Sequence, residues 1–131
     1  MPVISGGKLT YVEARRNKDG LAGNFNVNIK INSVKKGKSG FSILYTYVAD
    51  YVDDMGHLKI EGEADVTGEG WENLYGEWEK TKKFNTRFSE VFLSYVAFIV
   101  AANGTLVVRP LNLTPPIAQV KLTVGEETPA Q

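Results

Sequence analysis

The chain has 131 residues and no cysteine, and its 15 lysine and arginine residues balance its 15 aspartate and glutamate residues. A chain of this length builds one domain around a single core. The charge balance provides no field that would gather nucleic acid or an anionic membrane, and the lack of cysteine excludes disulfides, thiolate metal sites and a cysteine nucleophile. We expect one domain over residues 1–124, followed by a short polar tail over residues 125–131.

The start of the sequence and its apolar runs lead us to expect no targeting signal. Its first residues do not combine a charged start with an apolar run, so we expect no signal peptide. The longest apolar run, residues 91–102, is interrupted by Ser94 and is shorter than the roughly 20 residues of a membrane span. We therefore expect a soluble cytoplasmic protein with no membrane partner.

The first half of the chain has the two-residue period of β-strands. In FNVNIKI, apolar residues from Phe25 to Ile31 alternate with asparagine and lysine, and LKIEGEADV from Leu58 repeats the pattern. The run FSILYTYVADYV, which includes Tyr45 and Tyr47, is apolar on both faces and is typical of a central strand. A weaker strand is expected over residues 9–16, and NKDG, KKGKSG and DDMG contain turn-forming residues. Four strands joined by short turns predict an antiparallel meander.

The period changes after Gly70 to that of helices. Trp71, Leu74, Tyr75 and Trp78 follow the spacing of an amphipathic helix. The segment KTKKFNT ends this helix with positive charge, and its Asn85 or Thr86 suits the N-cap of the next one. The chain is thus predicted to be an α+β protein, a four-stranded antiparallel sheet followed by two helices.

The second predicted helix, residues 88–102, is apolar on nearly all sides. A helix of this kind needs cover on more than one face, and a chain this short has one sheet to provide it. We therefore expect Leu93, Val96 and Val100 to lie in the interface of a homo-oligomer, either a dimer or a tetramer. Asn103 and Gly104 are expected to end the helix.

The segment after this helix, GTLVVRPLNLTPPIAQ from Gly104, combines prolines with large apolar residues. We expect an extended cover in which Leu111 and Leu113 share one face and Asn112 faces the other way, tied to a neighbouring loop or strand. A connector that merely completes the core is the alternative.

This order of elements resembles the SecB-type chaperones, in which a Gly-Thr after the long helix leads into a Pro-x-Leu-Asn-Leu-x-Pro segment. The residues that match here are Gly104, Thr105, Leu111, Asn112, Leu113 and Pro115, with Pro110 directly before Leu111. The similarity extends over about residues 58–122. It implies an ATP-independent holdase that binds unfolded polypeptides in apolar grooves and assembles through dimers into a tetramer. The secretory member of the family is acidic and ends in a Cys/His zinc tail, whereas this chain is neutral and ends GEETPAQ, so we expect no docking to the translocation motor.

The candidate binding residues are aromatic and apolar. We expect Tyr45, Tyr47, Trp71, Tyr75, Trp78, Leu111 and Leu113 to line a groove for extended polypeptide. Core packing is the alternative for each of them. Two other functions stay open, namely an adaptor whose apolar surfaces serve self-assembly and a binder of small apolar ligands.

Catalytic, metal and nucleic-acid sites are not expected. His57 lies near Asp50, Asp53 and Asp54 in the sequence, but these residues fit a hairpin turn better than a metal site. The sequence has no glycine-rich phosphate loop and no serine–histidine–aspartate pattern, so we predict no enzyme and no cofactor. Basic residues such as Lys36 lie in turns and strand ends without an aromatic platform beside them, which argues against nucleic acid.

Overall fold

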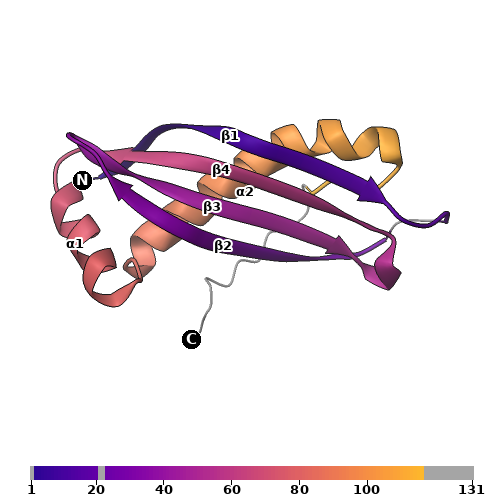
Figure 1. Ribbon diagram of the computed structural model, residues 1–131, viewed down its shortest axis with the longest axis horizontal. Helices are drawn as coiled ribbons and strands as arrows, with labels where there is room; N and C mark the ends of the chain where they lie inside the picture. Colours follow the sequence, from indigo (N-terminus) through magenta and orange to yellow (C-terminus); the bar gives the residue numbers. More distant parts are fainter. Residues whose placement is uncertain (1, 21–22, 117–131) are drawn as a thin grey trace.

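The computed structural model describes residues 2–20 and 23–116. The fold is a four-stranded antiparallel sheet followed by two helices, which confirms the predicted α+β class (Figure 1). The elements are β1 (Val3–Arg16), β2 (Phe25–Lys36), β3 (Gly40–Tyr51), β4 (Gly56–Thr67), α1 (Trp71–Thr81) and α2 (Thr86–Val108), with short 3₁₀ turns at Val52–Asp54 and Arg109–Leu111. The domain boundary expected at residue 124 lies outside the described residues.

The strand order is β1-β4-β3-β2, which differs from the predicted four-strand meander. Strands β2, β3 and β4 form a meander, but β1 pairs with β4 rather than with its sequence neighbour β2. The connection over residues 17–24 makes this possible. Crossing from β1 to β2 covers roughly 14 Å at the usual strand spacing. An extended chain advances roughly 3.3 Å per residue, so this connection is long enough for the crossing. Because β1 and β2 stand at the two ends of the strand order, both are edge strands.

Strand β1 begins at Val3, earlier than its apolar pattern predicted. Its pairing with β4 shifts register between Ile4 and Gly6 and again between Leu9 and Tyr11. Each bulge changes which face the following side chains occupy, so alternation read from the sequence broke down there. The first bulge lies in the part of β1 that the sequence pattern missed, and the second interrupts the alternation within residues 9–16.

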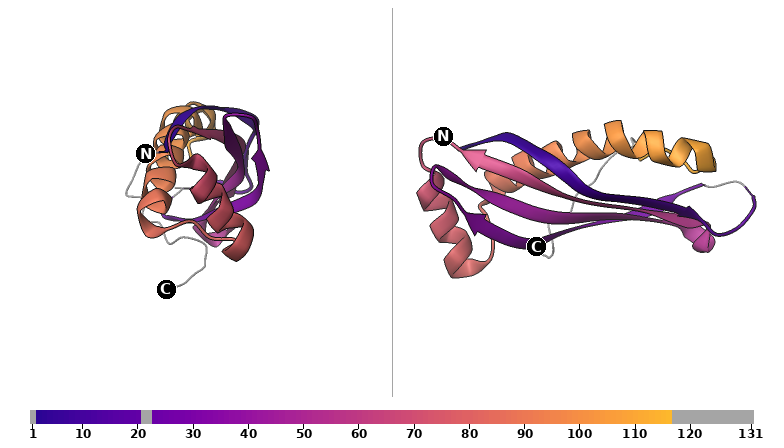
Figure 2. Two further views of the ribbon diagram at one scale, coloured as in Figure 1. Left: turned by 90° about the vertical axis from the view of Figure 1, so that its left-hand side faces the viewer. Right: turned by 45° about the horizontal axis from the view of Figure 1, so that its top comes forward.

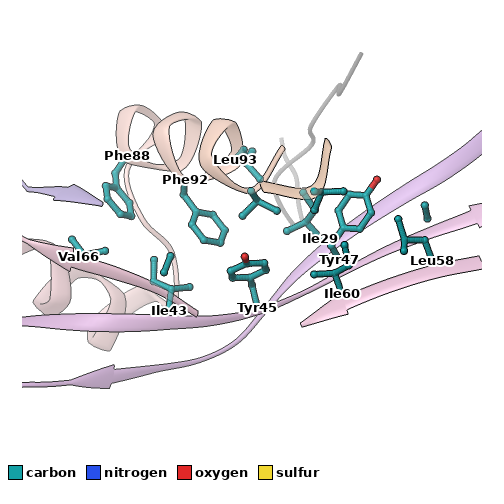
Figure 3. Packing of buried hydrophobic residues seen from close by; sticks show 14 of the residues in the cluster. Ile29, Ile43, Tyr45, Tyr47, Leu58, Ile60, Val66, Phe88, Phe92 and Leu93 are labelled. Carbon is teal, nitrogen blue, oxygen red and sulfur yellow. The ribbon is translucent and has the colours of Figure 1, made fainter. Parts of the chain in front are cut away.

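One face of the sheet forms one side of the hydrophobic core. Along β3 and β4, alternate residues are buried, among them Tyr45, Ile60 and Val66, and they lie beneath α2 (Figure 3). Burial of these side chains provides most of the driving force for folding. Both helices lie on this side of the sheet (Figure 2).

Helix α1 packs across one end of the sheet against β3 and buries Trp71 and Leu74. It ends at Lys82, which has a left-handed backbone and donates its N–H to the carbonyl of Trp78. Of the two predicted N-cap residues, Asn85 caps α2, because its Oδ1 accepts the backbone N–H of Phe88 at 2.8 Å.

Helix α2 does not end at Asn103 and Gly104, so the predicted helix stop was wrong. The helix continues to Val108, and Gly104 is buried inside it. A Cβ on Gly104 would lie 3.0 Å from Leu58 Cδ2 and 3.0 Å from Pro116 Cγ. The glycine is therefore explained by close packing rather than by chain reversal.

The continuous helical segment Thr86–Leu111 is long and apolar enough to cross a membrane by length and composition alone. The core helix of a soluble protein passes the same test. Here every fourth residue from Phe88 to Val108 is buried, and α2 packs against β1 and β4 (Figure 1). The inward side of α2 is thus an ordinary core face.

Candidate functional site

Three of the predicted binding residues come together at the α1 end of the molecule. Trp71 and Tyr75 lie against Phe41 of β3. The centroid of the Phe41 ring is 6.4 Å from that of Trp71 and 5.8 Å from that of Tyr75. Trp78 stacks on Phe84 at 5.0 Å, and Phe84 in turn lies 5.8 Å from Phe41. We call Phe41, Trp71, Tyr75, Trp78 and Phe84 the aromatic end.

Part of the aromatic end faces solvent. Trp71 and Phe41 are buried, whereas Tyr75, Trp78 and Phe84 are half-buried. The Nζ atom of Lys36 lies 5.8 Å from the centroid of the Tyr75 ring, a distance at which a cation is attracted to the ring face. The expectation that the basic residues have no aromatic ring beside them was therefore wrong for Lys36. Within residues 2–20 and 23–116, Lys36 forms no ion pair.

Tyr45 and Tyr47 lie elsewhere, beneath α2, and are core residues of the single chain. Tyr45 is 1% exposed and its ring meets Phe92 edge-on at 5.7 Å. Its hydroxyl lies over Gly62 and has no hydrogen-bond partner in the described part of the chain. Burial raises the pKa of Tyr45 to about 12 and raises that of Tyr47 as well. The side chains predicted for a single groove are thus divided between the surface and the core.

Two tyrosines of β3, one in the middle of the strand and one at its end, provide stability predictions of opposite sign. Tyr45→Phe removes a buried hydroxyl without a partner and is expected to raise the free energy of unfolding by about 1 kcal/mol. Tyr51→Phe removes the hydroxyl that donates to the carbonyl of Thr114, and is expected to lower it by about 1 kcal/mol. Urea unfolding measures both, and equal shifts of the same sign would contradict this assignment.

The segment after α2 is not extended at its start. Arg109–Leu111 forms a 3₁₀ turn with Pro110 near its first position, where a missing N–H is tolerated. Asn112 then takes a left-handed backbone with φ 56°, and the N–H of Leu113 donates to the carbonyl of Val108. Leu111 is half-buried, and Leu113 is 3% exposed within the core. The prediction that Leu111 and Leu113 line one side of an extended segment was therefore wrong.

Other residues than Asn112 tie this segment down. The guanidinium of Arg16 donates to the carbonyl oxygens of Leu111 and Asn112 at 3.0 and 3.1 Å. Thr114 Oγ1 donates to the carbonyl of Gly23 at 2.9 Å, and Thr114 O accepts from the Tyr51 hydroxyl. Sequence reasoning missed Arg16. The available signal was a charged residue at the end of a strand, two positions after the inward-facing Ala14.

The residues predicted for the subunit interface lie on the inner side of α2. Leu93, Val96 and Val100 are buried in the chain's own core, because the sheet covers this face of the helix. The apolar residues left on the outer side are Phe98, which is 71% exposed, Leu106, which is 70% exposed, and Val91. Together with the exposed Ala102 they form a row with spacings of seven, four and four residues, and we call this row the outer stripe.

His57 lies on the opposite, solvent-facing side of the sheet. Its Nε2 lies 2.5 Å from Glu13 Oε2, and Glu13 also accepts the hydroxyl of Tyr11. The hydrogen bond from Tyr11 has the largest effect on the pKa of Glu13, followed by the one with His57, and both lower it. Within the described ranges, no three His, Asp or Glu side chains are grouped so as to hold a metal ion.

Comparisons with models of known protein families, with curated proteins and with solved structures find no match to this chain. Any function assigned to it therefore depends on its own sequence and geometry.

Proposed function

We propose that the protein is a SecB-like holdase of the cytoplasm, a homo-oligomer that binds unfolded or extended apolar polypeptide without ATP, cofactor or catalysis. The observation that carries the proposal is the aromatic end, where Tyr75, Trp78 and Phe84 are half-buried side by side. Large rings that are partly fixed by packing bind apolar side chains with little loss of conformational entropy.

The arrangement of the aromatic end suits an extended client better than a small molecule. The half-buried rings come from α1 and from the loop before α2, so they form a surface that spans two elements. Lys36, above Tyr75, adds a cation at its rim. A polypeptide can place successive apolar side chains on such a surface while its backbone stays hydrated.

The outer stripe supports self-association. A row of exposed apolar side chains with spacings of four and seven residues lies on one face of a helix and is the pattern of a helix that packs against another helix. The occupant we propose is the same stripe of a second copy, because a row on one helix face is complementary to itself under twofold symmetry. The stripe also supports the alternative function, an adaptor whose apolar surfaces serve assembly alone.

The client-binding test uses Trp78→Ala, with Tyr11→Ala as its matched control. Tyr11 is an exposed aromatic residue on the opposite side of the sheet. Trp78→Ala is expected to weaken binding of a chemically unfolded model protein about tenfold or more, in keeping with the loss of an aromatic anchor. Fluorescence anisotropy of the labelled client measures affinity, and circular dichroism confirms that each variant is folded.

Tyr11→Ala is expected to bind the client as the unchanged chain does. Equal losses in both variants would place binding outside the aromatic end. An assembled wild-type protein that neither binds the unfolded client nor delays its aggregation would rule out the holdase and favour the adaptor.

A further inference from the structure

Residues 111–116 form a short strap that leaves the end of α2 and packs back over the core side of the sheet. Leu113 is buried in the core, and Pro116 is close enough to Gly104 to contact any side chain placed there. Apart from Leu111, which ends the 3₁₀ turn, the strap belongs to neither the sheet nor a helix. The hydrogen bonds described above join it to Arg16 at the end of β1, to Tyr51 at the end of β3 and to Gly23 before β2.

We propose that Arg16 is a positioning residue that holds this strap closed, and that opening the strap exposes an apolar site for the client beneath Leu113. The first part of this inference stands on the geometry alone. The second part rests on the proposed holdase function.

The contacts of Arg16 are those of a clamp. Its Nη1 atom donates to the carbonyls of Leu111 and Asn112, and its Nη2 atom donates to the carbonyl of Gly20. One guanidinium thus joins the helix end to the β1–β2 connection. Arg16 forms no ion pair within residues 2–20 and 23–116, so its donors act on carbonyl oxygens.

This position uses two favourable electrostatic effects. Hydrogen bonds from a charged donor are stronger than those between neutral groups. The carbonyls at the C-terminal end of a helix carry partial negative charge, which a cation stabilises. Lysine would provide the charge but not the planar set of donors that reaches several carbonyls at once.

The strap can open without disrupting the sheet. The backbone N–H groups of Asn112 and Leu113 donate to Arg109 and Val108 at the end of α2, whereas side chains of Arg16, Tyr51 and Thr114 join the strap to β1, to β3 and to Gly23. Local opening costs least where few backbone bonds must break. Leu113 occupies a position among core residues that a client side chain would take, so a client competes with it and gains access in proportion to the open population.

The test measures opening by the reactivity of a single thiol. The chain has no cysteine, so Leu113→Cys provides one probe under the strap. Val96→Cys provides a matched probe that is fully buried in the middle of α2. Each is combined with Arg16→Ala, with Arg16→Lys and, as a control, with Arg15→Ala, whose side chain is exposed.

We expect Arg16→Ala to increase the labelling rate of Leu113→Cys about tenfold, which corresponds to about 1.4 kcal/mol. Arg16→Lys should give a smaller increase and Arg15→Ala none. Labelling of Val96→Cys should stay unchanged, because α2 remains folded when the strap opens. An unchanged rate at Leu113→Cys, or an equal increase at both probes, would overturn the assignment of Arg16.

A second experiment tests client binding with the cysteine-free Arg16→Ala variant and the unfolded model protein. The rate at which the model protein associates with this variant is expected to rise by a factor similar to the increase in the labelling rate. Faster labelling without faster association would overturn the site beneath the strap. If the unchanged chain binds no client, the proposed function fails, while the labelling rates still decide the role of Arg16.

Discussion

Replacing both Phe98 and Leu106 with glutamate is expected to leave a folded monomer, whereas we expect the unchanged chain to form an oligomer. Their side chains are about 70% exposed in the single chain, so the substitutions do not disturb the core. In a symmetric pair of α2 helices, each subunit contributes both residues. Burial of each apolar side chain contributes about 1.5–3 kcal/mol, and the glutamates would add unpaired charge to the interface. Light scattering coupled to size-exclusion chromatography gives the mass.

The controls separate assembly from folding. Val52→Glu places the same charge on a partly exposed valine of the 3₁₀ turn after β3 and should leave the mass unchanged. Val96→Glu introduces a charge into the core beneath α2 and should unfold the chain. A monomeric wild-type protein, or a double variant that keeps the oligomeric mass, would show that the outer stripe is not the interface.

Gly7→Ala is expected to lower the free energy of unfolding by about 3 kcal/mol, at the upper end of the usual cost of overpacking. An added Cβ would lie 2.3 Å from the backbone oxygen of Glu63 and 2.4 Å from the Tyr95 hydroxyl. The side-chain oxygen can move, but the carbonyl belongs to the β1–β4 pairing. The substitution must therefore displace the first half of β1 from the sheet.

Gly76→Ala is the matched control with the opposite sign. A Cβ on Gly76 of α1 would have no neighbouring atom within 4 Å. Alanine lowers the conformational entropy of the unfolded chain, so it should raise the free energy of unfolding by about 0.5–1 kcal/mol. Urea denaturation at equal protein concentration compares the two variants. A Gly7→Ala variant as stable as the unchanged chain would mean that β1 is not held in this register.

For the candidate site, the sequence predicted which residues are large and apolar, but it did not predict which of them are exposed and which are buried. The spacing of Trp71, Tyr75 and Trp78 placed them together, because neighbours on one helix face are fixed by local geometry. Tyr45 and Leu113 had the same apolar character but are buried in the core. Their exposure depends on which side of the sheet α2 covers, and a pattern within one strand or loop does not contain that information.

The sequence by itself determined the elements whose period is unbroken. The alternation of residues 25–31 in β2 and of β4, the apolar run of β3, the apolar spacing of α1 and the N-cap at Asn85 or Thr86 all depend on contacts within a few residues. Tertiary structure decided the pairing of β1 with β4, the continuation of α2 through Gly104 and the clamp from Arg16 to the strap. Each of these joins segments far apart in the chain, and the energies that favour them come from long-range packing and hydrogen bonds. The same packing placed Val96 in the core and left Phe98 on the surface, since both residues are apolar and only the position of the sheet distinguishes them.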